Sequence, residues 1–226
     1  MLGGPALAHA AAREGGPKPP PPPAFTIALS REVGARGTTV AREVGERLGW
    51  PVYDHEILER LACEMKLHPR RLLDLDEKHA NLLTEFIASF STGPVVSETA
   101  YVQHLIKAVL ALGAQGGCVI VGRGAPHLLP PETTLRVRLL ADRDDRIGVM
   151  SQRLGIPRPE AARYVEKKDR ERDLFVKHHF HKDTADPRLY DLVLNSTRFS
   201  VGECADLILE ALRRFQGRSA APAAKP

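Results

Sequence analysis

The stretch SREVGARGTT at residues 30–39 decides the fold, because it joins a short apolar run to an amphipathic one. The run before it, FTIAL at residues 25–29, is typical of a buried β-strand, and the pattern over residues 39–48 is helical and ends at Gly49. In such a loop glycines let backbone N–H groups turn toward one point, and the following helix N-terminus adds partial positive charge. The stretch therefore predicts either an anion-binding loop or an ordinary strand-to-helix turn.

Short apolar runs alternate with longer helical patterns along the rest of the chain. The other predicted strands are PVY at 51–53, CVIV at 118–121, LRVRLL at 135–140 and YDLVL at 190–194. Helices are predicted over residues 39–48, 55–65, 82–90, 98–112, 143–154, 159–180 and 200–214, the last opening on Ser200-Val-Gly-Glu203, a capping box. Continuous apolar strands that alternate with helices predict an α/β domain with a mainly parallel sheet.

The ends of the chain differ in composition from its middle. Residues 1–23 finish in PKPPPPP, which predicts a disordered proline-rich arm, and residues 217–226 are expected to form a disordered tail. The folded domain is therefore expected over residues 24–216. Its long helical stretch from 55 to 113 contains no convincing strand, which indicates an insert or a subdomain that covers the substrate.

Composition limits the kind of partner. The 226 residues include 32 Lys plus Arg and 28 Asp plus Glu, and this net charge of +4 is too small to require a nucleic acid. Cys63, Cys118 and Cys204 lie far apart, which excludes a disulfide framework and a CxxC zinc site and favours a reducing cytoplasm. No apolar run is long enough for a membrane span. We expect a cytoplasmic protein with small-molecule partners, and the oligomeric state stays open.

The loop lacks the lysine of the standard GxxxxGK[ST] motif. Together with CVIVGRGA at 118–125 and DPRLYDLVLN at 186–195, residues 25–61 resemble the cytidylate kinase-like family of P-loop proteins, whose loop has the style I-S-R-E-x-G-x-G-G-R-E. The resemblance spans about residues 25–212. It implies a P-loop NTPase-like three-layer fold with a mainly parallel five-stranded sheet, a helical substrate-side insert over about 55–113 and a helical lid over about 158–182.

The resemblance also implies ATP and Mg²⁺ as cofactors. Arg36 takes the position of the glycine before the family's lysine, Gly37 the lysine position and Thr38 the Mg²⁺-ligating position. The positive charge that the lysine gives to the phosphates must come from another residue or be absent. Arg31 and Arg36 are the nearest candidates to supply it. The residues expected to bind the donor phosphates are Ser30, Arg31, Gly34, Ala35, Arg36, Gly37, Thr38 and Thr39.

Two residues after strands are candidates for binding the acceptor. Arg123 resembles the arginine of the G-R-D motif in cytidylate kinases and is expected to clamp the acceptor phosphate, although Gly124 stands where the family has aspartate. Asp54 follows the second strand, where the resemblance places it near the acceptor. A helix N-cap role for Asp54 is equally compatible with the sequence.

The segment RYVEKKDRERDLFVKHHFHK at 163–182 carries the lid candidates. In nucleoside monophosphate kinases an arginine-bearing lid closes over the phosphates and stabilises charge on the transferred group. Arg170 and Lys177 are seven residues apart and share a helix face. The expected catalytic residues are Arg170, Arg172 and Lys177 on the lid, with Arg36 on the loop.

The resemblance implies transfer of the ATP γ-phosphoryl group to a nucleoside monophosphate, with CMP or dCMP as the family's acceptor and the diphosphate as product. No general base is required, because the acceptor phosphate is already an anionic nucleophile. Two alternatives stay open. One is a nucleotide-binding regulatory module that has lost transfer, and the other is a kinase of a different small-molecule acceptor.

Overall fold

The structure is a computed structural model that describes residues 24–58 and 97–220. Within these ranges five strands form one parallel sheet in the order β2-β3-β1-β4-β5. The strands are β1 (Thr26–Arg31), β2 (Val52–Tyr53), β3 (Cys118–Val121), β4 (Thr134–Leu140) and β5 (Leu192–Asn195). The α/β class and the parallel five-stranded sheet predicted from the sequence are confirmed.

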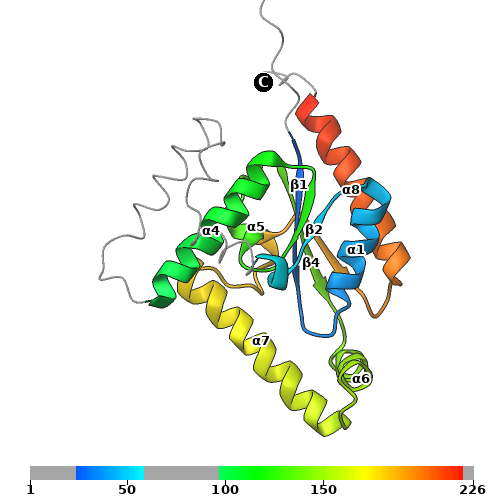
Figure 1. Ribbon diagram of the computed structural model, residues 1–226. Coiled ribbons are helices and arrows are strands. Elements are labelled where there is room, and N and C mark those ends of the chain that lie inside the picture. Colours follow the sequence, from blue (N-terminus) through cyan, green and yellow to red (C-terminus); the bar gives the residue numbers. More distant parts are fainter. Residues whose placement is uncertain (1–23, 59–96, 221–226) are drawn as a thin grey trace, which may run out of the picture.

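Helices cover both faces of the sheet (Figure 1). Along β1, Ile27 and Leu29 pack into the core beneath α1 (Gly37–Leu48) and α8 (Val201–Ala220). The alternate residue Ala28 packs into the core beneath α4 (Ser97–Gln115) and α5 (Ala125–Leu128). Burial of both faces explains why the central strands are apolar throughout their length.

Two further helices lie at the edge of the sheet where the strands end. Figure 1 shows α6 (Arg143–Leu154) and α7 (Arg158–Phe180) beyond the carboxyl ends of the strands. A small third core of Val33, Ile147, Met150, Ala161 and Val165 joins these helices to the loop after β1. Ligands of parallel α/β folds collect at this edge, so α7 lies where a cover for a ligand is needed.

Several boundaries differ from the sequence-based predictions. Helix α5 and the 3₁₀ turn η2 (Pro187–Leu189) were not predicted, because each is under two turns long. Helix α8 extends to Ala220, past the tail predicted from residue 217, and Pro222 is the first residue beyond it that cannot continue a helix. The predicted helix over 82–90, the arm at 1–23 and the end of the tail lie outside the described residues. Among the described helices, none is long and apolar enough to cross a membrane.

The capping box that opens α8 is present, which leads to a stability prediction. The Ser200 amide donates to the Glu203 carboxylate at 2.8 Å, and the Glu203 amide donates to the Ser200 hydroxyl at 3.3 Å. Ser200→Ala is expected to lower the free energy of unfolding by about 1 kcal/mol, because one amide of the first turn loses its acceptor. Urea denaturation measures the change, and Ser200→Thr, which keeps the hydroxyl, should retain most of the stability. Equal losses in both variants would contradict this role.

Candidate active site at the carboxyl ends of the strands

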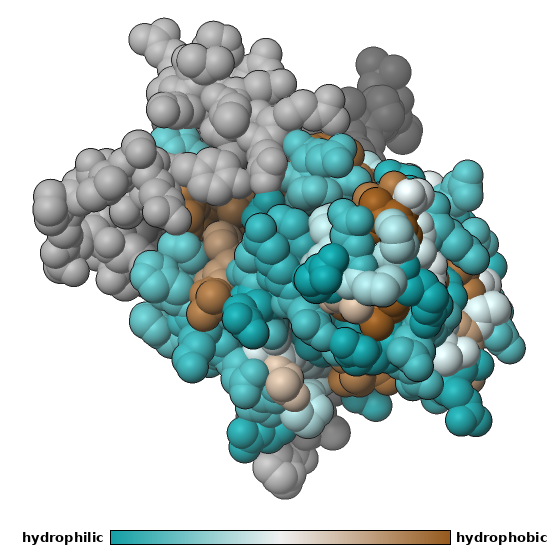
Figure 2. All heavy atoms as spheres, turned by 90° about the horizontal axis from the view of Figure 1, so that it is seen from below, coloured by the Kyte–Doolittle hydropathy of each residue, from teal (hydrophilic) through white to brown (hydrophobic). Residues whose placement is uncertain are grey.

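A cavity of about 860 Å³ opens where β1 and β3 end. Its walls are the loop after β1, the turn after β3 and the inner side of α7. Figure 2 views the molecule from the side of α6 and α7 and shows a mainly hydrophilic surface there. Of the predicted donor-binding residues, Ala35 is fully buried and the others line the cavity: Ser30, Arg31, Gly34, Arg36, Gly37, Thr38 and Thr39.

The loop leaves backbone N–H groups open toward the cavity. Arg36 adopts a left-handed conformation with φ 55° and turns the chain into α1. No acceptor among the described residues takes the amide hydrogens of Gly37, Thr38 or Thr39, which form the first turn of that helix. Open amides at a helix N-terminus attract anions. The geometry therefore favours the anion-binding interpretation of the loop over an ordinary turn.

An acidic residue of α7 fastens the loop to the two helices beyond it. The Val33 amide donates to Asp169 Oδ1 at 2.8 Å, and Arg146 of α6 donates to the other oxygen of the same carboxylate. Arg146 Nε also lies 3.5 Å from Glu32 Oε2. These contacts hold α6 and α7 against the start of the loop, and Arg146 is thereby occupied with structural carboxylates.

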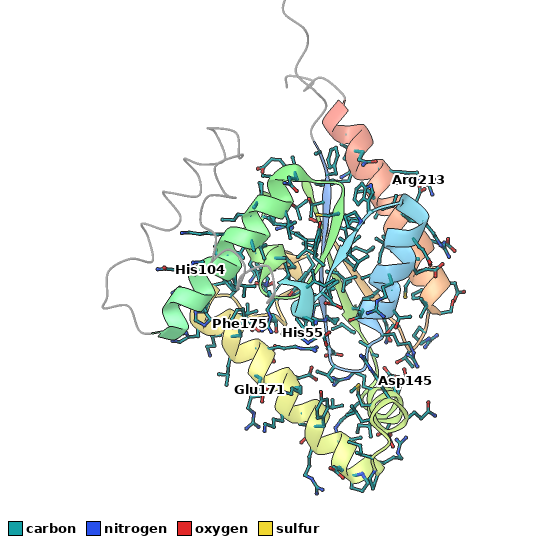
Figure 3. The ribbon with its side chains drawn as sticks, viewed as in Figure 1. His55, His104, Asp145, Glu171, Phe175 and Arg213 are labelled. Carbon is teal, nitrogen blue, oxygen red and sulfur yellow. The ribbon has the colours of Figure 1, made fainter. Side chains whose placement is uncertain are left out.

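Arg36 has a structural partner of its own. Its guanidinium donates to both oxygens of Asp145, at 2.6 and 2.8 Å, and to the Ser196 carbonyl at 3.1 Å. The bidentate pair raises the pKa of Arg36 and lowers the pKa of the Asp145 carboxyl. Figure 3 shows Asp145 at the start of α6, on the side where α1 and its loop lie. The Arg36 side chain therefore joins the loop to α6 and to the end of β5.

Three other arginines come together at the cavity from three elements. Arg31 comes from the end of β1, Arg123 from the turn after β3 and Arg172 from α7. Arg172 Nη1 donates to the backbone carbonyl of Arg31 at 3.3 Å, and the Arg123 guanidinium lies 5.7 Å from the centre of the Phe175 ring. Figure 3 shows Phe175 on α7 and His55 after β2, and both residues line the cavity.

The mutual repulsion of these arginines appears in their acid–base properties. Burial first, and then the charges of Arg172 and Arg123, lower the pKa of Arg31 to about 9. Burial also lowers the pKa of Arg172, with Arg123 adding to the effect. The pKa of His55 is lowered by burial and then by Arg31 and Arg123. Such a concentration of positive charge favours the binding of an anionic ligand.

A second group of residues lines the cavity on the face of the sheet covered by α5. Arg138 of β4 donates to the Ser30 hydroxyl at 3.2 Å and to the Tyr190 hydroxyl at 3.3 Å. His127 of α5 also lines the cavity, and its ring centre lies 5.9 Å from that of Tyr190. Burial, together with Lys182, Arg136 and Arg138, lowers the pKa of His127 to about 4, so the ring is neutral at pH 7.

The neutral His127 gives a prediction about acid stability. The pKa of His127 in the folded state, about 4, lies below the reference value of 6.5. Between pH 6.5 and 4 the imidazole is therefore protonated in the unfolded chain but stays neutral in the folded chain. The folded state should therefore lose about 1–2 kcal/mol between pH 6.5 and 4 on account of this residue. His127→Gln should show a shallower loss in urea denaturation over that range. Parallel pH profiles for the two proteins would contradict the assignment.

The remaining predicted residues do not line the cavity. Asp54 Oδ1 accepts from the amides of Glu56 and Ile57, at 3.2 and 3.3 Å, so it caps the helical turn that begins at His55. The negative charge of Asp54 also raises the pKa of Arg31, against the larger lowering by burial and by Arg172 and Arg123. Arg170 and Lys177 are exposed, and neither lines the cavity. Their predicted roles in transfer stay predictions, whereas Arg172 of the same helix does line the cavity.

Sequence reasoning missed Arg138, His127 and the clamp made by Asp169. The alternation in LRVRLL does place Arg136 and Arg138 on one face of a strand, but it does not say which helices cover that face. Asp169 binds a backbone amide 136 residues earlier in the chain, which no local pattern reveals.

The donor set fits a Mg²⁺ ion bound mainly by phosphates. Thr38 lines the cavity in the first turn of α1, while the described residues contain no cluster of three or more His, Cys, Asp or Glu side chains suited to a metal. Mg²⁺ in nucleotide sites usually keeps several waters and takes one or two protein oxygens together with phosphate oxygens. The Thr38 hydroxyl is a suitable single protein ligand, as predicted from the sequence.

Comparison with known families agrees with this arrangement. Residues 26–198 match the cytidylate kinase-like family, and the chain therefore belongs to the cytidylate kinase-like family. The resemblance drawn from the loop is thereby confirmed, and membership of the family supports a phosphotransferase. No curated protein gives a significant match to the chain.

The chain is also similar to several solved structures. An uncharacterized protein from Eubacterium ventriosum is 20% identical, with a TM-score of 0.64 over 84% of this chain and 98% of the other. A shikimate kinase from Bacteroides thetaiotaomicron is 16% identical, with a TM-score of 0.46 over 84% and 98% of the two chains. A gluconokinase from Sinorhizobium meliloti is 11% identical, with a TM-score of 0.47 over 88% and 97%. At 20% identity, the similarity to the Eubacterium ventriosum protein shows a shared fold alone.

Proposed function

We propose that the protein transfers the γ-phosphoryl group of ATP to a nucleoside monophosphate, with CMP or dCMP as the acceptor. An oxygen of the acceptor phosphate forms a bond to the γ-phosphorus of ATP. The bond from that phosphorus to the oxygen bridging to the β-phosphate breaks, and its electron pair leaves with ADP. The products are ADP and the nucleoside diphosphate, and the step needs no general base.

The observation that carries this proposal is the meeting of Arg31, Arg123 and Arg172 at one cavity beside open amides of α1. Neither Arg31 nor Arg172 forms an ion pair with a carboxylate among the described residues. Two bound phosphate groups, one from the donor and one from the acceptor, would supply the negative charge that this cluster requires. An acceptor that already carries a phosphate fits this charge better than a neutral sugar does.

Each wall of the cavity has a part in the proposed reaction. The amides at the start of α1 hold the donor phosphates, and the Thr38 hydroxyl would hold a Mg²⁺ ion that would neutralise part of their charge. Arg123 holds the acceptor phosphate, since a guanidinium binds two phosphate oxygens at once. Arg172 covers the transfer from α7 and shields it from water. Catalysis then consists of positioning and charge neutralisation.

The test is transfer by the purified full chain. The protein is incubated with Mg²⁺ and ATP and, separately, with CMP, dCMP, UMP, AMP, GMP, shikimate or gluconate, and ADP and the phosphorylated acceptor are both quantified. The expected result is ADP and CDP or dCDP in equal amounts. Product from shikimate or gluconate alone would replace the acceptor in the proposal. Tight ATP binding without transfer to any acceptor would favour a regulatory module instead.

A further inference from the structure

Two glycines border the path of the Arg31 side chain. A Cβ atom on Gly37 would lie 2.6 Å from Cγ and 2.7 Å from Cβ of Arg31, distances that real side chains do not adopt. A Cβ atom on Gly122 would lie 2.1 Å from Nη1 of Arg31. The stem of Arg31 therefore packs against the first residue of α1, and its guanidinium packs against the residue that follows β3. The side chain spans from the donor loop to the turn that carries Arg123.

We propose that Arg31 supplies the cation that a lysine at position 37 supplies in the standard phosphate loop, and that its guanidinium bridges the transferred phosphoryl group and the acceptor phosphate. The inference rests on the proposed function and deepens it. The cation reaches the phosphates from the end of β1, and Gly37 is glycine because the arginine stem fills the space beside it.

The surroundings of Arg31 distinguish it from Arg36, the other candidate on the loop. Arg36 is held by a bidentate pair with Asp145, whereas no carboxylate among the described residues forms an ion pair with Arg31. With its pKa lowered to about 9, Arg31 is still protonated at neutral pH, so it holds a buried positive charge. Phosphate oxygens are the natural partner for such a charge.

The packing of the Arg31 side chain against Gly37 predicts how a lysine at position 37 would change activity. Gly37→Lys alone should lower activity, because the new Cβ would meet the Arg31 stem. In an Arg31→Gly background both atoms that a Cβ at residue 37 would meet, Cγ and Cβ of Arg31, are absent. There the same Gly37→Lys change should raise activity, since it restores a cation by the standard route. The sign of the Gly37→Lys effect is thus expected to depend on residue 31.

The experiment compares variants at residues 31 and 37 of the full chain in the transfer assay, with thermal melting as a check on folding. Arg31→Met keeps most of the stem and removes the charge, and it should lower kcat about a hundredfold or more. Arg31→Gly/Gly37→Lys should exceed Arg31→Gly at least about tenfold in kcat/KM. Arg163→Met, an exposed arginine of α7 that does not line the cavity, is the matched charge-removal control.

A folded Arg31→Met protein with the kcat of the unchanged chain would overturn the inference, as would a Gly37→Lys effect of the same sign in both backgrounds. Binding of inorganic triphosphate, measured by calorimetry, separates this inference from the proposed reaction. Where the unchanged chain transfers to no acceptor, the proposed function fails, yet Arg31→Met should still weaken triphosphate binding at least about tenfold. Unchanged triphosphate affinity in that variant would overturn the inference as well. Arg31→Lys, which retains a charge, should lose less than Arg31→Met in each measurement.

Discussion

Arg123→Met is expected to lower kcat/KM for the nucleotide acceptor about a thousandfold, chiefly through a higher KM. The residue follows the fully buried strand β3, and its guanidinium is held over the Phe175 ring at the cavity wall. Methionine fills a similar volume next to Phe175 but offers no donors to a phosphate. Losing a guanidinium that binds a phosphate in a site shielded from water costs a large part of the acceptor's binding free energy. Steady-state kinetics with the acceptor varied at saturating ATP measures the effect.

The matched control for Arg123 is Arg213→Met on α8. Arg213 is exposed, pairs with Glu210 on its own helix, and lies far from α7 (Figure 3). Its loss should leave both KM values unchanged, since exposed ion pairs of this kind contribute little. A rise in the KM for ATP without a rise in the KM for the acceptor would contradict the role given to Arg123. That outcome would place the guanidinium on the donor side of the cavity.

The sequence predicts the part of the site whose geometry is set by neighbouring residues. The stretch from Ser30 to Thr39 joins a strand to a helix. The open amides at the start of that helix therefore point beyond the end of β1. Arg123 lies in the turn after β3, two residues beyond Val121, and the resemblance to the G-R-D motif assigns it to the acceptor phosphate. Parallel strands end at one edge of a sheet, and two such turns must therefore lie close together.

The sequence could not decide which of two nearby arginines faces the ligand. Arg31 and Arg36 are five residues apart, and either spacing suits a phosphate loop. What separates them is Asp145, which lies 109 residues after Arg36 and accepts from its guanidinium with both carboxylate oxygens. The glycines that make room for Arg31 are likewise informative only after folding has placed Gly122 next to its guanidinium. Long-range partners of this kind leave no periodic signal in the chain.

Helix α7, the predicted lid, shows the same limit of sequence-based prediction. Spacing along a helix predicts that Arg170 and Lys177 share a face, but it cannot say which face meets the cavity. In the structure α7 turns Arg172, Phe175 and Val176 toward the cavity and leaves Arg170 and Lys177 exposed. The contact of Asp169 with the Val33 amide fixes this rotation of the helix. The orientation of the lid is thus a property of its docking contacts.

Arg172→Met is the second change expected to have a large effect, lowering kcat about a hundredfold with a smaller change in KM. Its guanidinium donates to the Arg31 carbonyl at the end of β1 and lines the cavity, so it is placed to reach a group transferred there. Stabilisation of charge that develops during transfer appears in kcat, whereas ground-state binding appears in KM. Single-turnover measurements with both substrates saturating report the chemical step directly.

Arg170→Met on the same helix is the comparison that decides how the lid acts. Arg170 carries the same charge two residues away, but it is exposed and outside the cavity lining. If α7 acts through the Arg172 guanidinium directed at the phosphates, Arg170→Met should lower kcat less than about threefold, because exposed charges interact weakly through water. Equal losses from Arg170→Met and Arg172→Met would mean that the lid acts through its overall positive charge, and that the sequence-based prediction for Arg170 is right. A dependence of the Arg172 effect on ionic strength would point the same way, since a buried contact is screened far less than a surface field.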